Sequence, residues 1–288
     1  MKLLTWNIQW GRGADGRVDL ARIASHIRRL GELDVICLQE VTSGYAELDG
    51  NDGADQFAAI EQLFPEYAAL SGFAMDCAGS DGSDGGGRRK RFGNMLLSRH
   101  PVRQAFRHLL PWPSDPHAPN MQRLALEANI DTPQGLLRIS TTHLEYYSMM
   151  QRAAQIARLR ELHVEAVMHA REPGPGKATD GPFSGALRAA PAILCGDCNF
   201  KPDSVSRVQL LQFIDAVTPP YRDAWNVLHP GTMHTPTVGL YDKKQWPGEP
   251  FTFDYFFVSE DLLPRLRTMT VDTLSDASDH QPLMLELA

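Results

Sequence analysis

The stretch Ala192-Ile193-Leu194-Cys195-Gly196-Asp197-Cys198-Asn199-Phe200 decides how the rest of the chain is interpreted. It begins as a short apolar run and ends in Gly, Asp and Asn, a pattern typical of a buried β-strand followed by a turn. If the strand stays extended, its side chains alternate between two faces. Asp197 and Asn199 then share one face, and Cys198 points to the other. The alternative is an Asx-turn that only caps the strand.

The bulk composition is that of a globular protein. The 288 residues are 43% hydrophobic and 22% charged. No apolar run reaches membrane-spanning length, and residues 1–7 lack the apolar core and cleavage site of a signal peptide, so we expect a cytoplasmic protein without a membrane span. The net charge of −7 argues against a general nucleic-acid binder without excluding one, because such proteins usually carry a basic face.

The four cysteines are too few for a disulfide scaffold in a chain of this length. Cys195 and Cys198 have the spacing of a redox pair. Strand alternation would place their thiols on opposite faces, however, and no helix start follows them. A redox protein is therefore the disfavoured alternative.

Two further apolar runs end in polar side chains near the N-terminus. Residues 2–8 indicate a strand with Asn7 near its end, and residues 34–40 indicate a strand that ends at Glu40. Between them, residues 20–30 have the apolar spacing of a helix. The strand–helix–strand order places Asn7 and Glu40 at the ends of neighbouring strands. Taken singly, they could be a turn residue and a solvated carboxylate.

The second half of the chain adds histidines and further carboxylates. Two alternating runs at 123–130 and 136–142 flank a Gly-containing turn, which predicts a hairpin followed by His143. The aromatic strand predicted at 251–258 is interrupted by Asp254, and burying an unpaired carboxylate there would cost several kcal/mol. Near the C-terminus, the adjacent pair Asp279-His280 is a candidate for orienting an imidazole.

The remaining pattern predicts one α/β domain over residues 1–288. Helices are also expected at 54–63, 149–169 and 206–214, and strands at 67–70, 92–98 and 283–287. Residues 76–91, with the basic run Arg88 to Arg91, and residues 219–251 are expected to be irregular loops. Because several strands are hairpin partners, we favour two packed sheets with outer helices over a purely parallel sheet.

Six short motifs occur in a fixed order along the chain: Trp6-Asn7-Ile8, Leu38-Gln39-Glu40, Thr142-His143-Leu144, Gly196-Asp197-Cys198-Asn199, Phe253-Asp254-Tyr255 and Ser278-Asp279-His280. Each motif is weak alone, but the ordered set resembles the endonuclease/exonuclease/phosphatase superfamily, which has the DNase I-like fold. The resemblance covers nearly the whole chain. It implies an α/β (α+β) four-layer sandwich of two packed mixed β-sheets flanked by helices, with a site at one end of the sheets.

The resemblance also implies a Mg²⁺ or Mn²⁺ ion and a role for each matching residue. Glu40 matches the principal metal-binding carboxylate, with Asn7 beside it and Asp279 near the same ion. Asp197 matches the residue that orients or deprotonates the attacking water, and Asn199 matches its positioning partner.

The two histidines also match histidines of the superfamily. His280 matches the histidine that contacts the scissile phosphate, and Asp254 matches the carboxylate that orients it. His143 matches the second histidine of DNase-like and sphingomyelinase-like members. The abasic-site endonuclease branch tends to carry a tyrosine in place of His143, so a dedicated abasic-site repair enzyme is not favoured.

Elementary chemistry agrees with these roles, because carboxylate and amide oxygens suit Mg²⁺ and the ion can polarise a phosphoryl group. We expect a metal-dependent phosphodiesterase that cleaves a P–O bond by in-line attack of water. Arg123, Asn94 and Tyr146 are candidate substrate contacts. The alternatives are a DNA or RNA nuclease and a catalytically inactive module that binds a phosphate ligand. The sequence does not indicate the natural substrate, the choice between diester and monoester, or the oligomeric state.

Overall fold

The computed structural model describes residues 1–79, 89–177, 181 and 188–288, and it contains two six-stranded sheets. The first sheet has the order β11 (Leu266–Val271), β12 (Leu283–Leu287), β1 (Lys2–Asn7), β2 (Val35–Ser43), β4 (Arg89–Ser98) and β3 (Ala68–Ala78). The second has the order β5 (Val102–Leu109), β6 (Leu124–Thr132), β7 (Gly135–His143), β8 (Ala192–Asp197), β10 (Asp254–Ser259) and β9 (Tyr221–Asp223). The pairs β1/β2 and β7/β8 are parallel and the others antiparallel, so both sheets are mixed.

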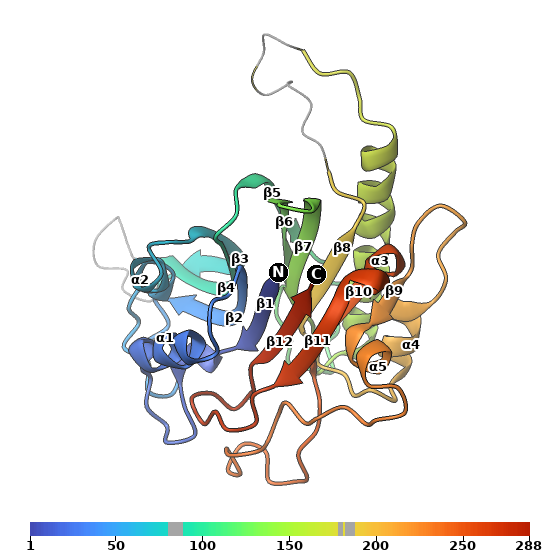
Figure 1. Cartoon of the computed structure of the whole chain (residues 1–288). Helices are drawn as coiled ribbons and strands as arrows, with labels where there is room; N and C mark the ends of the chain where they lie inside the picture. Colours follow the sequence, from blue (N-terminus) through green and yellow to red (C-terminus); the bar gives the residue numbers. More distant parts are fainter. Residues whose placement is uncertain (80–88, 178–180, 182–187) are drawn as a thin grey trace.

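The described residues form five helices, of which the first four lie outside the two sheets, as Figure 1 shows, and the fifth packs Ala224 and Trp225 into the core between the sheets. They are α1 (Leu20–Arg29), α2 (Gln56–Leu63), α3 (Met149–Arg171), α4 (Val205–Leu211) and α5 (Ala224–Leu228), with short 3₁₀ turns η1 (Gln9–Gly11) and η3 (Glu260–Arg265). Helices α1 and α2 cover the first sheet, and α3 and α4 cover the second. The predicted four-layer sandwich is confirmed.

Adjacent residues of the central strands pack into different layers of the core. Leu3 lies between the sheets, whereas Leu4 packs beneath α1 and α2. Ile193 likewise lies between the sheets, and Leu194 packs beneath α3 and α4. A strand buried on both faces needs apolar side chains on both, which explains why these segments are continuous apolar runs.

The longest helix, α3, has 23 residues but carries arginines and glutamates along its length. Within the described parts of the chain, no helix is both long and apolar enough to cross a membrane.

Two expected loops contain regular structure. Of residues 76–91, the first three belong to β3 and the last three to β4, and Cys77 pairs with Lys90 in this extension of the hairpin. Residues 80–88 lie outside the described residues, as do 178–180 and 182 of a Pro/Gly-rich stretch. Of residues 219–251, β9 and α5 occupy 221–228. The edge strands β5 and β11 were not predicted either.

Strand register brings the predicted polar residues to one end of the sandwich. His143 is the register partner of Asp197 in the parallel pair β7/β8, and Asp254 is the partner of Asp197 in the antiparallel pair β8/β10. In the other sheet, Asn7 pairs with Gln39, directly before Glu40. The sheet pairings alone therefore gather residues that lie far apart in the sequence.

Candidate active site

A cavity of about 220 Å³ opens at this end of the sandwich. Its walls are formed by Trp10, Glu40, Phe92, Met121, Arg123, His143, Tyr146, Tyr147, Asp197, Asn199, Gln245, Trp246, Asp279 and His280. Six of the eight residues predicted to be catalytic or metal-binding thus face one cavity. The other two, Asn7 and Asp254, lie directly behind it and contact residues that line it.

Asn7 connects the two sheets at the floor of the cavity. Its Nδ2 donates to Glu40 Oε1 and to Asp197 Oδ2, each at 3.0 Å, while its Oδ1 accepts the backbone N–H of Gln9. In this arrangement Asn7 orients the two carboxylates. Its predicted role as a metal ligand through its oxygen stays a prediction.

The turn after β8 is both an Asx-turn and a part of the cavity wall, the two alternatives that its sequence left open. Asp197 Oδ1 accepts the backbone N–H of Asn199 at 2.9 Å, which is an Asx-turn. Asp197 and Asn199 nevertheless both line the cavity, whereas Cys198 packs into the core beneath α3. Cys195 lies between the sheets and both thiols are free, so the spacing does not form a disulfide.

Strained backbone is concentrated at this site. Among the described residues, the non-glycine residues with positive φ are Gln9, Trp10, Glu40 and Asn199, with φ between 44° and 60°. Three of them line the cavity, and Gln9 donates to the cavity residue Gln245 at 2.7 Å. Glu40 also lies at a shift in the β2/β4 register. Such conformations cost about 1–3 kcal/mol each and cluster where function requires a particular side-chain direction.

His280 is held by a buried carboxylate. His280 Nδ1 lies 2.8 Å from Asp254 Oδ2, and the same oxygen accepts the hydroxyl of Thr237 at 2.6 Å. Nε2 of His280 lies 3.7 Å from Asp197 Oδ2. The imidazole therefore presents Nε2 to the cavity while Nδ1 is fixed from behind.

The two histidines of the site have opposite charge preferences. Burial opposes a charge on His280, but the carboxylates of Asp254, Asp279 and Asp197 together raise its pKa well above the usual range. Burial lowers the pKa of His143 well below the usual range, and the nearby cations Arg123 and His280 lower it further. At neutral pH we therefore expect a cationic His280 and a neutral His143.

Burial, together with neighbouring carboxylates, disfavours the charged forms of the site carboxylates. Burial and the nearby Asp279 raise the pKa of Glu40 to about 7, although Asn7 and His280 oppose the shift. Burial also raises the pKa of Asp197 to about 6, with His280 opposing and Asp254 adding to the shift. A bound cation would relieve this repulsion.

The donor atoms fit a divalent cation. Ligand atoms of Glu40, His143 and Asp197 lie within 4.8 Å of one another. Two carboxylates and an imidazole nitrogen are donors that a divalent ion such as Mn²⁺ accepts, and the carboxylate oxygens also suit Mg²⁺. Asp279 lines the same cavity but is not a member of this closest group.

The predicted substrate contacts have different positions. Arg123 lines the cavity with only 6% of its surface exposed, and its Nε donates to the buried Glu145 at 3.2 Å. Tyr146 also lines the cavity. Asn94 does not; it is buried, and its Nδ2 lies 3.5 Å from the backbone oxygen of Thr141.

Several cavity residues were not expected as site residues: Trp10, Phe92, Met121 and Gln245. They come from the segment after β1, from β4, and from loops before β6 and β10. Trp10 is the residue that the sequence could have indicated, because it follows the candidate residue Asn7 by three positions and lies just past the end of the same strand.

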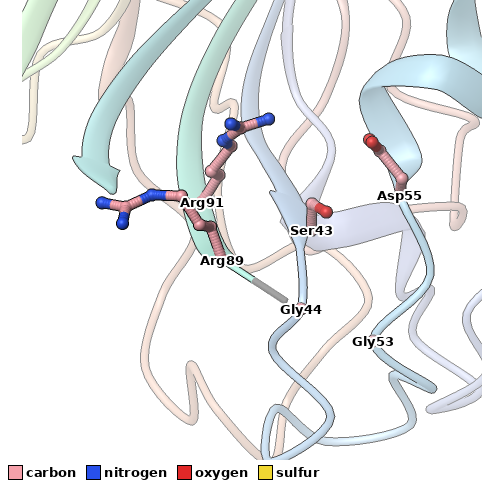
Figure 2. A pocket seen from close by; sticks show the side chains of 6 residues that line it. All are labelled: Ser43, Gly44, Gly53, Asp55, Arg89 and Arg91. Atoms are coloured by element: carbon pink, nitrogen blue, oxygen red, sulfur yellow. The ribbon is translucent and has the colours of Figure 1, made fainter. Parts of the chain in front are cut away.

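A second hollow of about 410 Å³ lies further along β2 and β4, the strands that carry Glu40 and Phe92. Figure 2 shows Arg89 and Arg91 on β4 opposite Ser43 and Asp55. Ser43 follows Glu40 by three residues on β2 and pairs with Arg91. Arg89 is paired with Asp76 on the neighbouring strand. The charges of this hollow are thus partly balanced within the protein.

Two mixed sheets between helices, with acids, amides and histidines at one end, define a DNase I-like protein. The chain belongs to the endonuclease/exonuclease/phosphatase family, whose model matches residues 4–280. Members of this family are generally hydrolases of phosphoester bonds. A search of curated proteins found no match to the sequence.

Solved structures share the fold at low sequence identity. An endonuclease/exonuclease/phosphatase from Beutenbergia cavernae is 24% identical with a TM-score of 0.65, and the alignment covers 100% of this chain and 72% of that one. A mannosyl-6-phosphatase from Bacteroides thetaiotaomicron is 15% identical (TM-score 0.64; coverage 100% and 99%). A 3′ phosphatase from Neisseria, bound to a product DNA hairpin, is 17% identical (TM-score 0.62; coverage 100% and 99%). At these identities the comparison supports the fold alone.

Proposed function

We propose that this protein is a divalent-metal-dependent phosphodiesterase that cleaves a P–O bond by in-line attack of water. The observation that carries the proposal is the convergence of Glu40 from one sheet with His143 and Asp197 from the other on a cavity that also holds His280. Every ionisable residue of the predicted set lies at this site. This supports catalysis over an inactive module that only binds a phosphate ligand.

Asp197 is the residue proposed to orient and deprotonate the water. Its Oδ1 is used by the Asx-turn, while Oδ2 lies at the centre of the site, within 3.0 Å of Asn7 Nδ2 and 3.5 Å of His143 Nε2. In the metal-free protein, burial raises the pKa of Asp197 to about 6, which favours a carboxylate that can accept a proton from water. Asn199 holds the turn, with its Nδ2 donating to Leu144 O at 2.9 Å.

The histidines are proposed to act differently. A cationic His280 would donate from Nε2 to a phosphoryl oxygen, where negative charge grows as water attacks. A neutral His143 would donate a hydrogen bond to the phosphate or leaving oxygen without adding a second cation. Environments that push the pKa values of two titratable groups apart are a common basis for assigning such roles.

Glu40 is proposed to hold Mg²⁺ or Mn²⁺, with Asn7 and Asp279 at the same end of the site. When bound, the ion supplies Lewis-acid polarisation of the phosphoryl group and stabilises the leaving oxygen. The burial of Glu40 beside the carboxylate of Asp279, which raises its pKa to about 7 without a bound ion, supports this assignment.

A nuclease is the second candidate. It is favoured by the buried Arg123 in the cavity wall and by the hollow with Arg89 and Arg91, which lies where a longer phosphate chain could extend. The similar folds of a sugar phosphatase and of a DNA 3′ phosphatase make both substrate types worth testing.

The test is hydrolysis of bis(p-nitrophenyl) phosphate, p-nitrophenyl phosphate and supercoiled plasmid, each with Mg²⁺, Mn²⁺ or EDTA. We expect EDTA-sensitive cleavage with the diester preferred over the monoester. Asp197→Ala and His280→Ala should each lower the rate by about 10²–10⁴-fold. Preferred plasmid cleavage would favour the nuclease, and metal-independent turnover would contradict the proposal.

A further inference from the structure

Asp279 is held by the loop that precedes β10. Its Oδ2 accepts two hydrogen bonds, from Trp246 Nε1 at 2.9 Å and from Gln245 Nε2 at 3.0 Å. Both donors come from residues 239–250, and both also line the cavity. One oxygen of a site carboxylate is thus fixed by side chains that face the substrate space.

The indole of Trp246 is also part of the cavity wall. It packs edge-to-face against Tyr146, with ring centroids 6.1 Å apart, and against Phe251 at 5.4 Å. Edge-to-face packing holds the ring plane without burying it completely. The ring of Trp246 thus lines the cavity, while its N–H donates to Asp279.

The loop has anchors that do not depend on Trp246. Gln9 Nε2 donates to Gln245 Oε1 at 2.7 Å, and Arg12 Nη1 donates to Asp242 Oδ2 at 3.4 Å. Tyr241 donates to Thr273 O at 2.9 Å. Removing the indole N–H should therefore leave the loop in place.

We propose that Trp246 is a positioning residue for this site: its N–H orients Asp279 toward the metal, and its ring forms the wall that contacts a planar substituent of the substrate. This inference rests on the proposed function, because it assumes that Asp279 faces the bound ion. Partners that orient a ligand from behind typically change metal affinity or activity by 10–100-fold when removed.

The two roles can be separated by two substitutions. Trp246→Phe keeps an aromatic ring but removes the donor, whereas Trp246→Leu removes both. For Trp246→Phe we expect the Kd for Mn²⁺, measured by calorimetry on metal-free protein, to rise about tenfold. We expect its KM for bis(p-nitrophenyl) phosphate at saturating Mn²⁺ to stay within twofold of wild type. Trp246→Leu should show the same loss of metal affinity and a KM raised about two- to tenfold.

Tyr241→Phe is the matched control, because it removes one side-chain hydrogen bond of the same loop that does not reach Asp279. A double-mutant cycle with Asp279→Asn tests whether Trp246 acts through Asp279. The effect of Trp246→Phe on the Kd for Mn²⁺ should largely disappear when Asp279 is already changed. Thermal unfolding of each variant reports whether it is folded.

The outcomes distinguish this inference from the proposed function. If wild-type protein does not bind Mn²⁺, the proposed function fails and the inference fails with it. If wild type binds Mn²⁺ but folded Trp246→Phe binds it equally well or more tightly, only the inference is overturned. A full effect of Trp246→Phe in the Asp279→Asn background also overturns it.

Discussion

His280 Nδ1 lies 2.8 Å from Asp254 Oδ2, in a position where both side chains are buried. The other oxygen of Asp254 is buried without a hydrogen-bond partner among the described residues. The carboxylate is therefore committed to His280 and to the hydroxyl of Thr237. A buried carboxylate in this position favours the cationic form of the imidazole.

Asp254→Asn should lower activity by about 10²–10³-fold and change its pH dependence. Asp254 contributes most to raising the pKa of His280 against burial, so its neutralisation lowers that pKa. Since the cation is the proposed active form, activity should then be lost at a lower pH as the pH rises. The measurements are a kcat/KM profile and an NMR titration of His280.

Thr237→Val is the control for this prediction. It removes the second hydrogen bond to Asp254 without removing a charge, so we expect a smaller loss of rate and a smaller movement of the alkaline limb. An Asp254→Asn profile that keeps the wild-type alkaline limb would contradict a cationic His280.

Metal affinity should increase with pH. In the metal-free protein Glu40 has a pKa of about 7, so protons compete with the ion below neutrality. Displacing one such proton predicts an apparent Kd for Mn²⁺ that falls roughly tenfold between pH 6 and pH 8. Calorimetry in buffers of different ionisation enthalpy would detect the released proton. Glu40→Gln should bind Mn²⁺ weakly, and its Kd should depend less on pH than that of wild type. A wild-type Kd that is independent of pH would contradict the assignment of Glu40 as a metal ligand.

The same carboxylate predicts the pH dependence of stability without metal. The pKa of Glu40 is about 7 when folded and near 4.5 when unfolded, so the folded state binds the proton more tightly. Its stabilising contribution is complete below pH 4.5 and is lost as the pH rises through about 7. In EDTA at pH 8, Glu40→Gln should therefore be more stable than wild type by about 1–3 kcal/mol, a range that allows for partial solvent exposure.

Urea unfolding at pH 5 and pH 8 measures this difference. At pH 5 the two proteins should be closer in stability, and saturating Mg²⁺ at pH 8 should stabilise wild type more than the variant. Glu61→Gln on the exposed side of α2 is a surface control. Equal stability of Glu40→Gln and wild type at pH 8 in EDTA would show that folding does not raise the pKa of Glu40.

The predictable part of this protein is its central strands and the polar residues that end them. The segments around Asn7 and Asp197 are largely apolar because they are buried on both faces, and their polar ends stand out for that reason. His143 stands out differently, at the end of an alternating hairpin strand. The family motifs then placed these ends at a common site. Edge strands such as β5 and β11 alternate with polar residues, so their patterns are less distinct.

Other features depend on contacts that no local pattern encodes. The β3/β4 extension pairs Cys77 with Lys90, although the Asp-, Gly- and Arg-rich sequence of residues 76–91 predicts a loop when considered without that pairing. The left-handed conformation of Glu40 and the contact of Trp246 with Asp279 arise only when distant segments meet. The inward position of Asn94 is likewise set by the packing of the two sheets.

Gly196→Ala should strongly destabilise the protein. Gly196 has a φ of +128°, and a Cβ atom there would lie 2.0 Å from the backbone oxygen of Thr142 on the paired strand. Strain and overpacking together predict a loss of about 3–5 kcal/mol, and the next residue is Asp197. Thermal unfolding measures the effect. Gly174→Ala, where the added Cβ meets open space, is the control, and an unchanged midpoint for Gly196→Ala would refute the close approach of β7 and β8.

The ion pair between Arg123 and Glu145 allows the structural and substrate-binding roles of Arg123 to be separated. Glu145 is fully buried, so Arg123→Met leaves a buried charge without its cation and should cost about 3–5 kcal/mol in urea unfolding. Arg123→Met/Glu145→Gln removes both charges and should recover most of that stability. Because Arg123 also lines the cavity, we expect the raised KM for bis(p-nitrophenyl) phosphate to persist in the double variant. A wild-type KM in the stable double variant would mean that Arg123 supports the fold without contacting substrate.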